Sequence, residues 1–396
     1  MGFKIDIFSP TKEHELLRDM VSDFAKNHLA PGAELRDKNE FFDGALFGRL
    51  GDLGLLGITA PEAYGGAGMD ATAAVIVHEE LSAVDPGFCL AYLAHAMLAV
   101  NNIVHNASDE QKKRYLPNMI SGAWMGAMAM SEPEVGTDVL GMKCRAEANN
   151  HGFVINGRKM WITNGQKDVA GNPADVLFLY AKTGDEKSDV SSFIIEGGQA
   201  GYYVGQNLKG KLGMRASNTA EIVLEDCAVR HDQLVGQVGH ALKHMMRNLE
   251  IERLTLAAMS LGIAKRCIHI MSHYANERMA FGQPLVKFGQ IQKYIAESYA
   301  KYQACRSYVY NVAYHTDLNQ AGNRIDSDGV KLITSTLAKE IADAAIQVLG
   351  GYGYMAEYVV ERLWRDAKLL EIGGGTLEAH QKNIALDLSK NLSKVG

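Results

Sequence analysis

Residues 152–165 of the 396-residue chain read GFVINGRKMWITNG, a pattern that differs from the helical patterns before and after it. The segment 152–155 has the apolar, β-branched composition of a strand, and the Asn156-Gly157 pair after it is typical of a two-residue hairpin turn. Segments of the same character, bounded by Gly, Asn or Asp, follow at 175–181, 192–196 and 221–229. Together they predict a small antiparallel β domain in the middle of the chain.

Helical periodicity flanks this domain on both sides. From about Thr11 to Gly122 apolar residues recur three and four positions apart, and the pattern returns from Ala241 onward. Glycine-containing breaks interrupt the second helical part at 282–284, 320–323, 350–353 and 373–375. We therefore predict an α+β chain of three domains: a helical domain at 1–125, a β domain at 126–239 and a helical domain at 240–396.

Composition narrows the classes of partner. The net charge is −6 and no Lys/Arg-rich run stands out, which argues against nucleic acid. The five cysteines are spread widely without a C-x-x-C motif, so neither a disulfide framework nor a cysteine zinc site is predicted. The histidine pairs His240/His244 and His269/His273 lack an obvious third ligand, so we predict no metal.

Location follows from the same composition. No segment is expected to be long and apolar enough to enter a membrane, and the first residues lack the pattern of a secretory signal or a transit peptide. We therefore expect a cytoplasmic protein, or a mitochondrial matrix protein from which a presequence was removed.

One carboxylate has an unusual position on the helical segment that begins at Ala241. At 100° per residue, Glu252 falls in the middle of an apolar stripe. The stripe consists of Met245, Leu249, Leu256, Met259, Ile263 and Ile270. Apolar neighbours should raise the pKa of Glu252 and suit it to proton abstraction near neutral pH. The alternative is that Glu252 pairs with a basic residue of another helix, whereas Glu250 points away as a solvated or paired acid.

Three further segments could approach a ligand. Residues 351–356 match G-x-G-x-x-A, but the preceding segment is helical in character rather than a strand, so a Rossmann fold is rejected and a plain turn stays open. Residues 372–376 form a second glycine-rich break before a helix, which favours an anion or a carbonyl oxygen. Trp161 and Thr163 offer a flat ring beside a hydroxyl, which suits an aromatic heterocycle, although a core tryptophan is the more common case.

Taken together, several segments resemble the acyl-CoA dehydrogenase family over nearly the whole chain. They are 129–133 (AMSEP) with 136–138 (GTD), 161–165 (WITNG), 278–282 (RMAFG), 347–353 (QVLGGYG) and 365–368 (RDAK). The resemblance implies an N-terminal helical domain, a central antiparallel β domain and a C-terminal four-helix bundle, assembled as a homotetramer. It also implies FAD between the β domain and the bundle, an acyl-CoA substrate, and an electron-transferring flavoprotein as partner.

The resemblance also implies which residues form the site. In the same chain, FAD would contact Met128, Met130, Ser131, Gly136, Thr137, Trp161, Ile162, Thr163, Thr376 and Glu378. The pyrophosphate and adenosine of FAD from a neighbouring subunit would contact Arg278, Phe281, Gln347, Gly350 and Gly351. The acyl-CoA would contact Thr137, Glu250, Arg253, Gly374 and Gly375.

Within the family, residues 249–254 (LEIERL) are similar to the helix on which the isovaleryl-CoA branch carries its base. Most members carry that base on the loop matched by residues 373–376, at the place of Gly374, where this chain has no carboxylate. Periodicity and resemblance thus both select Glu252 as the catalytic residue. The implied reaction is the dehydrogenation of a short, branched acyl-CoA to a trans-2-enoyl-CoA, with Gly373 and Gly374 leaving room beside C3.

Several alternatives stay open. The substrate could be a medium-chain, aryl or dicarboxylic acyl-CoA, the protein could be an oxidase of the same fold, and a non-catalytic flavoprotein is the most remote option. The chain also departs from the isovaleryl-CoA branch at three places. Gly289 replaces a Gln that touches FAD, Lys243 replaces an aromatic residue at the mouth of the substrate tunnel, and residues 166–173 look like an insertion.

Overall fold

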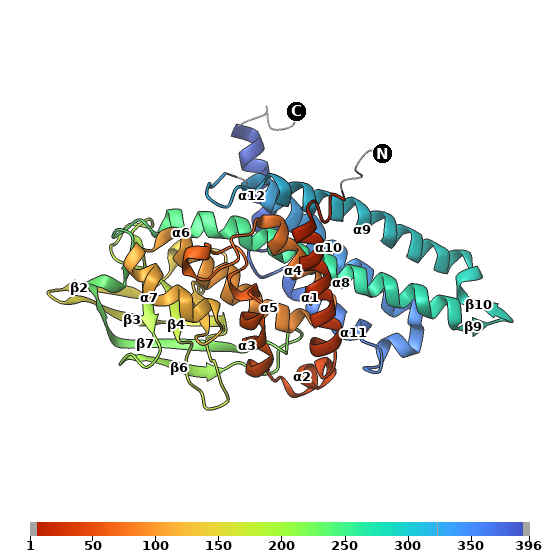
Figure 1. The fold of residues 1–396 in the computed structure, drawn as a ribbon, viewed down its shortest axis with the longest axis horizontal. Coiled ribbons are helices and arrows are strands. Elements are labelled where there is room, and N and C mark those ends of the chain that lie inside the picture. Colours follow the sequence, from red (N-terminus) through yellow and green to blue (C-terminus); the bar gives the residue numbers. More distant parts are fainter. Residues whose placement is uncertain (1–5, 323, 391–396) are drawn as a thin grey trace.

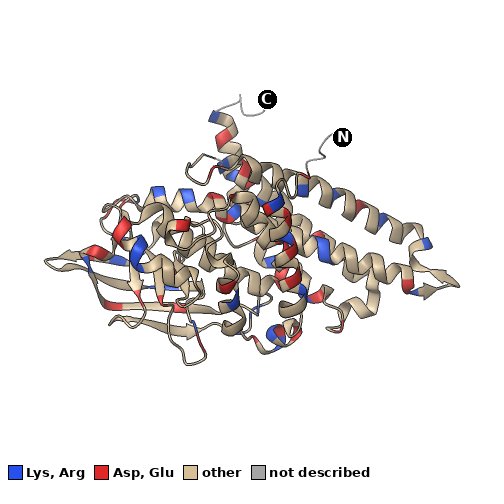
Figure 2. Cartoon of the chain, viewed as in Figure 1, with Lys and Arg blue, Asp and Glu red and all other residues tan. Residues whose placement is uncertain are grey.

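The computed structural model describes residues 6–322 and 324–390. Asn323 of the predicted break, and the ends of the two predicted outer domains, lie outside the described residues. The elements follow the order helices, sheet, helices, which confirms the predicted fold class (Figure 1). Figure 2 shows Lys, Arg, Asp and Glu mixed over the helices.

The N-terminal part is helical. Its helices are α1 (Lys12–Phe24), α2 (Ala33–Asn39), α3 (Gly44–Asp52), α4 (Ala71–Ser82), α5 (Pro86–Leu93), α6 (Asn101–Asn106) and α7 (Asp109–Ile120). Five of them begin where a side-chain oxygen accepts a hydrogen bond from a backbone N–H of the first turn, which satisfies an otherwise unpaired donor. These capping residues are Thr11, Asp43, Asp70, Asp85 and Ser108.

The middle part is one sheet. Its strands are β1 (Gly126–Ala129), β2 (Arg145–Asn149), β3 (Gly152–Thr163), β4 (Val176–Lys182), β5 (Val190–Glu196), β6 (Tyr202–Asn207), β7 (Thr219–Arg230) and β8 (Leu234–Val235). The order is β6-β7-β3-β2-β4-β5-β8, with β1 beside β4. The prediction of an antiparallel domain needs one correction, because β1 and β2 both pair with β4 in the parallel sense.

The predicted turn at Asn156-Gly157 is wrong. Strand β3 runs through both residues, and its pairing with β7 shifts register between Ile155 and Gly157. Gly157 has φ +155°, and a β-carbon there would lie 2.6 Å from Cα of Cys144. The glycine is therefore needed for close strand packing at a bulge rather than for a turn. The chain reverses instead between Asn149 and Gly152, which pair across the β2–β3 hairpin.

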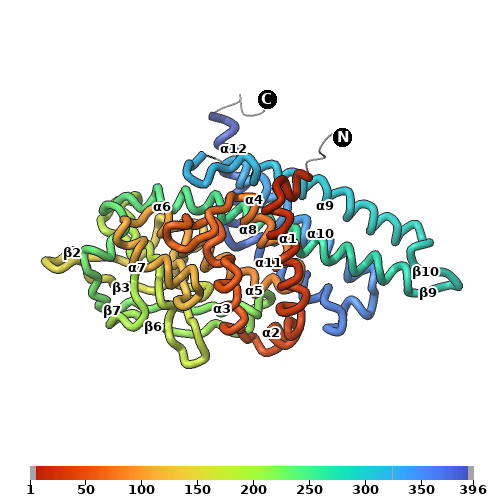
Figure 3. The backbone as a smooth tube through the Cα atoms, viewed as in Figure 1, coloured from red at the N-terminus to blue at the C-terminus, as the bar shows by residue number. Residues whose placement is uncertain are grey.

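The C-terminal part is a bundle. Its elements are α8 (Ala241–Glu277), the hairpin of β9 (Met279–Ala280) and β10 (Gln283–Pro284), α9 (Gly289–His315), α10 (Arg324–Leu349), α11 (Val360–Leu370) and α12 (Leu377–Lys390). Helix α8 packs against α9, α10 and α11, and against α4 of the N-terminal part. Figure 3 shows α8 running from the sheet to the β9–β10 hairpin, so this helix connects all three parts of the fold.

Two helical segments among the described residues, Pro86–Asn106 and Ala241–Glu277, are long and apolar enough to cross a membrane by length and composition alone. The expectation that no segment passes this test is therefore wrong. In the fold, 83% and 72% of their most apolar windows are buried inside the protein. Both are core helices, which are apolar on every side that meets another element.

Candidate active site

Glu252 lies on α8 where the helix is enclosed. Every residue from Ile251 to Ala264 is buried, and Glu252 itself is 7% exposed. Within residues 6–322 and 324–390, its Oε2 atom has no hydrogen-bond partner. Burial raises the pKa of Glu252 to about 7, although the nearby charges of Arg253 and Lys331 act in the opposite direction. The carboxyl can therefore gain and lose a proton near neutral pH.

The predicted surroundings of Glu252 agree with the structure in most respects. Met245, Leu256, Met259 and Ile263 of the predicted stripe are buried, whereas Leu249 and Ile270 are only partly so. On the other side of α8, the carboxylate of Glu250 accepts hydrogen bonds from the N–H of Gly322 at 3.0 and 3.2 Å. Glu250 is thus a paired acid, as periodicity predicted.

The glycine-rich turn between α11 and α12 meets Glu252. Gly374 and Gly375 have φ values of +69° and +107°, which favour glycine. A β-carbon on Gly374 would lie 3.4 Å from Oε1 of Glu252. Arg253 Nε donates to the Gly374 carbonyl at 3.4 Å. Three predicted substrate-binding residues, Arg253, Gly374 and Gly375, are therefore brought to the predicted base.

The space beside Gly374 is partly filled. The same β-carbon would lie only 2.3 Å from Cδ1 of Leu256, whereas one on Gly373 would meet nothing closer than 3.6 Å. The expectation that both glycines leave open room therefore holds for Gly373 and needs correction for Gly374. Leu256 narrows the space next to the carboxyl.

Two segments of the β domain, residues 130–132 and 159–160, are joined by hydrogen bonds and an ion pair. The backbone N–H of Met160 donates to the Ser131 carbonyl at 2.9 Å. Buried Lys159 donates from Nζ to the Met130 carbonyl at 3.0 Å and pairs with Glu132 at 2.9 Å. The predicted cofactor residues Met128, Met130 and Ser131 therefore keep a fixed position next to the end of β3. Sequence reasoning missed Lys159 and Glu132, because a lysine within a strand pattern is usually a solvent-facing residue.

The end of β3 presents an aromatic ring. The register with β7 shifts between Lys159 and Ile162. Trp161 has φ +60° and is 56% exposed, while Ile162 is buried in the sheet core. Asn164 Nδ2 donates to the Ala91 carbonyl at 2.8 Å and holds the strand end against α5. Trp161 can thus present a free ring surface beside Thr163, whereas Ile162 can offer a ligand only its backbone.

The other predicted residues of the same-chain site, Gly136, Thr137, Thr376 and Glu378, are exposed or partly exposed. Gly136 and Thr137 are exposed in the loop after β1, and Glu378 is exposed in the first turn of α12. Thr376 Oγ1 accepts a hydrogen bond from the N–H of Ala379 at 3.3 Å, so this hydroxyl caps α12.

A second group of predicted cofactor residues lies elsewhere. Arg278 and Phe281 belong to the exposed end of α8 and its hairpin, about 39 Å from Glu252 along the helix. The Arg278 guanidinium lies 5.9 Å from the ring of Tyr352, next to Gly350 and Gly351. Gln347 is exposed at the end of α10.

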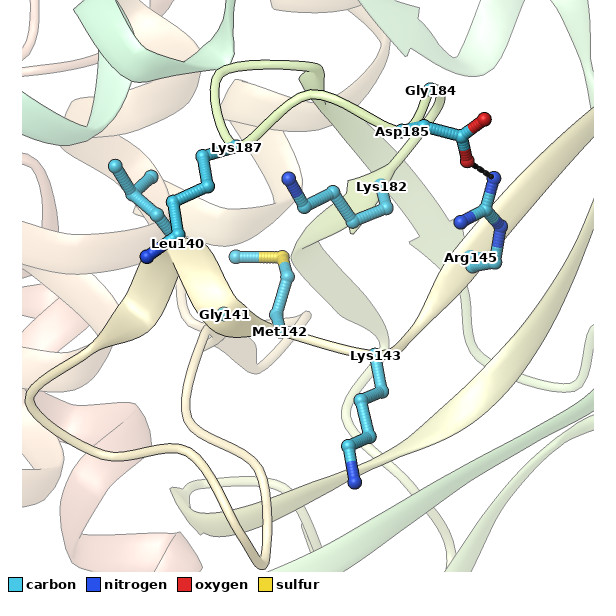
Figure 4. Close-up of a pocket in the computed structure, with 9 residues that line it drawn as sticks. All are labelled: Leu140, Gly141, Met142, Lys143, Arg145, Lys182, Gly184, Asp185 and Lys187. Carbon is cyan, nitrogen blue, oxygen red and sulfur yellow. Dashed lines mark hydrogen bonds and ion pairs between the residues drawn. The ribbon is translucent and has the colours of Figure 1, made fainter.

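A basic pocket of about 370 Å³ opens between residues 140–145 and residues 182–187, at the end of β4 and in the loop after it (Figure 4). Four cationic side chains line it: Lys143, Arg145, Lys182 and Lys187. Arg145 pairs with Asp185 at 2.9 Å, and Lys182 reaches into the space between the two segments. Sequence reasoning missed this pocket because its cations come from separate segments and form no run.

One face of β4 connects the pocket with Glu252. Lys182 lines the pocket, and Tyr180, two positions earlier, projects from the same side of the strand. Burial, and the charge of Glu252 nearby, raise the pKa of Tyr180. Its hydroxyl donates to Asn102 Oδ1 at 3.2 Å.

Comparisons with known proteins agree with this geometry. Three family models match the chain: the N-terminal, middle and C-terminal domains of acyl-CoA dehydrogenases, at residues 11–123, 127–227 and 239–388. A mitochondrial isovaleryl-CoA dehydrogenase from Solanum tuberosum is 41% identical over 97% of this chain and 92% of its own length. A mitochondrial 2-methylacyl-CoA dehydrogenase from the same plant is 40% identical over 94% of this chain and 90% of its own length.

Solved structures are also similar. A chain from a study of the electron transferring flavoprotein of Acidaminococcus fermentans has a TM-score of 0.92 and 33% identity, covering 98% of this chain and 99% of that one. An acyl-CoA dehydrogenase complexed with FAD, from Bacillus anthracis, has a TM-score of 0.90 and 32% identity, covering 97% of this chain and 68% of that one.

Proposed function

Because the chain belongs to the acyl-CoA dehydrogenase family of FAD-dependent oxidoreductases, we propose that it oxidises a short, branched acyl-CoA, with isovaleryl-CoA first, to the trans-2-enoyl-CoA. The observation that carries this proposal is the buried carboxyl of Glu252, which faces Gly374. One of its oxygens has no partner in the part of the chain that the structure describes, and burial raises its pKa to about 7. A group of this kind suits the removal of a weakly acidic proton.

The residues of the β domain fit a flavin. The free ring surface of Trp161 beside Thr163 suits a flat heterocycle, and the exposed loop at Gly136 and Thr137 leaves backbone groups for hydrogen bonding. FAD, when bound there, supplies the acceptor for the hydride that leaves the β-carbon. The protein contributes alignment and the exclusion of water.

Glu252 removes the α-proton of the thioester. That proton is weakly acidic, so the negative charge that develops on the carbonyl oxygen needs a donor. The backbone N–H of Gly374 is the donor that we propose, because its residue faces Glu252 and its turn is held by Arg253. Loss of the proton and of the β-hydride together forms the C=C bond.

The basic pocket supports a coenzyme A thioester. The phosphates of that group are polyanionic, and Lys143, Arg145, Lys182 and Lys187 would attract them. The thioester end would then lie along β4, past Tyr180, toward Glu252.

Leu256 supports a short acyl group. Its Cδ1 occupies the space next to Gly374, and the room that remains is on the side of Gly373. The two plant relatives act, by their names, on short branched thioesters. A medium-chain, aryl or dicarboxylic thioester is the alternative within the same reaction.

The assembly and the electron acceptor belong to the same proposal. Arg278, Phe281 and Gly350 are too far from Glu252 to serve the same FAD, which supports a homotetramer in which each subunit completes a neighbour's site. We propose an electron-transferring flavoprotein as acceptor, with an oxidase as the alternative. All five cysteines are free and buried, which is compatible with a reducing compartment such as the cytoplasm or a mitochondrial matrix.

One experiment tests the proposal. The purified protein should carry FAD, and anaerobic mixing with isovaleryl-CoA should bleach the flavin absorbance in a stopped-flow instrument. A panel of straight-chain, aryl and dicarboxylic thioesters, run in parallel, identifies the acyl group. Failure of every thioester to bleach bound FAD would refute the dehydrogenase, whereas a much higher kcat/KM for a C8 or aryl thioester would refute only the acyl group. Oxygen consumption during turnover would identify an oxidase.

A further inference from the structure

A buried polar cluster lies behind the turn that carries Gly374. Asp328 and Lys331 come from α10 and His380 from α12, and all three are 0% exposed. Asp328 Oδ1 contacts Arg253 Nη1 at 2.9 Å and His380 Nδ1 at 2.5 Å. Three helices that are distant in sequence therefore meet on a single carboxylate.

The cluster binds the turn through its carbonyl oxygens. His380 Nε2 lies 3.0 Å from the Gly375 carbonyl, and Lys331 Nζ lies 3.3 Å from the same oxygen. Lys331 Nζ also donates to the Leu370 carbonyl, at the end of α11. A carbonyl oxygen only accepts, so the lysine and the ring nitrogen are the donors. The turn is thus held at both ends, at the Leu370 carbonyl and at the Gly375 carbonyl.

Glycine needs this support more than other residues do. Gly374 and Gly375 have no side chain to pack, and a glycine backbone has more conformations to lose than any other. The thioester carbonyl of the substrate must lie against the N–H of Gly374. That N–H therefore needs a fixed position, because a misplacement of 1 Å can cost about 100-fold in rate. The glycines cannot supply this precision themselves.

We propose that Asp328, Lys331 and His380 are positioning residues that fix the Gly374 N–H opposite Glu252. This inference rests on the proposed function. Lys331 has a second effect, because its ammonium lies 3.3 Å from the Gly375 carbonyl in the turn that meets Glu252, and its charge there favours the ionised carboxylate. The other charged or titratable groups that face this pair are Arg253, Asp328, Glu371, His380 and Tyr180.

The main test is a pair of substitutions at one position. His380→Phe keeps a ring but loses both hydrogen bonds, whereas His380→Gln keeps a donor for the Gly375 carbonyl. We expect His380→Phe to lower the limiting rate of flavin reduction by about 10- to 100-fold, with thioester Kd changed by less than about threefold. His380→Gln should recover most of the rate. His78→Phe is the matched control, because His78 is also fully buried and bonds a backbone carbonyl, that of Ala74.

A second measurement needs no turnover. Amide hydrogen exchange of residues 373–376 in the FAD-loaded, thioester-free protein should be faster in His380→Phe than in the wild type or in His380→Gln. Exchange in β4 should stay unchanged. The His78→Phe control should leave the turn as protected as in the wild type.

Lys331→Met and Lys331→Arg test the charge. Loss of the cation in Lys331→Met should move the midpoint of the pH profile of flavin reduction upward, since ionised Glu252 loses a stabilising charge. Lys331→Arg should restore the midpoint. A purely structural role would change the rate without moving this midpoint.

The outcomes separate the two proposals. If wild-type protein reduces its flavin and His380→Phe does so at the same rate with unchanged exchange, the positioning role is refuted. If His380→Phe does not fold, Lys331→Met takes its place: unchanged rate and unchanged amide exchange of residues 373–376 in that variant refute the positioning role, and an unmoved midpoint refutes the charge effect. If no thioester bleaches the wild-type flavin, the proposed function fails instead.

Discussion

A β-carbon on Gly374 would lie 3.4 Å from Oε1 of Glu252. Side chains at these two positions would therefore reach the same small volume, one from the middle of α8 and the other from the turn between α11 and α12. A carboxylate at either position could reach a proton located between them. In this chain the carboxylate stands on the helix, and the turn offers only backbone.

Glu252→Gln should abolish most of the flavin reduction. The amide cannot take a proton, so we expect a loss of about 10²–10⁴-fold in the limiting rate, with FAD content and fold retained. Glu250→Gln is the comparison, because its carboxylate points about 160° away on the helix and bonds Gly322. It should alter thioester affinity at most. Bleaching of Glu252→Gln at nearly the wild-type rate would place the base elsewhere.

The rate of flavin reduction should rise with pH through about 7, because burial raises the pKa of Glu252 to about 7 and only the ionised form accepts a proton. Stopped-flow bleaching between pH 5.5 and 9 measures this directly. A rate that is flat over this range, or that falls through neutral pH, would contradict the assignment of the base.

The stability of the fold should also depend on the ionisation of Glu252, but it should fall as pH rises, whereas the rate of flavin reduction rises. The folded pKa of Glu252 lies above its ordinary value, so its contribution to stability is full below about pH 4.5 and is lost as pH rises through about 7. Glu252→Gln should therefore gain stability relative to the wild type at pH 8, on the order of 3 kcal/mol at most, and much less at pH 5. Urea unfolding of both proteins at the two pH values tests the sign.

The basic pocket should control thioester affinity. Lys182→Gln and Lys187→Gln should raise KM for a coenzyme A thioester and weaken its salt dependence, while kcat stays within about threefold. Lys293→Gln, on the surface of α9, is the control. A truncated pantetheine thioester, which lacks the nucleotide phosphates, should not distinguish the variants. An unchanged KM in both pocket variants would show that coenzyme A does not bind in this pocket.

Glu79 should be essential to the joint between the N-terminal helices and the bundle. It is 0% exposed on α4, pairs with Arg18 at 3.0 Å and Arg306 at 2.9 Å, and accepts from Tyr302 at 3.0 Å. Burial opposes its ionisation, but Arg306 and Arg18 hold the pKa of Glu79 at about 2. Glu79→Ala leaves Arg306 without its carboxylate partner and Arg18 with Glu80 alone, and it should cost about 3–5 kcal/mol of stability. In the wild type this contribution should be lost only as pH falls from about 4.5 toward 2.

The periodicity of apolar residues could predict those features of the fold and of the site that depend on a single helix or strand. The order of helices, sheet and helices was readable, and so was the position of Glu252, because an acid inside an apolar stripe is visible in α8 alone. The Asn156-Gly157 signal misled because a glycine at a bulge and a glycine in a turn look alike in sequence. Only the pairing of β3 with β7 separates them.

The supports of the site could not be predicted in this way. Lys331 and Asp328 read as polar positions of an amphipathic helix, and His380 as an ordinary histidine near the C-terminus. Their role depends on α10 and α12 meeting behind Gly375, which is a property of the tertiary fold. The pocket cations Lys182 and Lys187 are hidden for the same reason.

Moving the carboxylate from α8 to the turn should restore part of the lost activity, but only with a change at Leu256. In Glu252→Gly with Gly374→Glu, the new β-carbon would lie 2.3 Å from Cδ1 of Leu256. It would also force a non-glycine residue to φ +69°, at a cost of about 1–2 kcal/mol.

Adding Leu256→Ala removes the contact with Leu256, so the triple variant should bleach flavin faster than the double variant. Both should prefer butyryl-CoA over isovaleryl-CoA, because the new side chain fills the space beside C3. Leu256→Ala alone controls for the enlarged cavity. If the triple variant bleaches no faster than Glu252→Gly, the two positions do not serve the same proton.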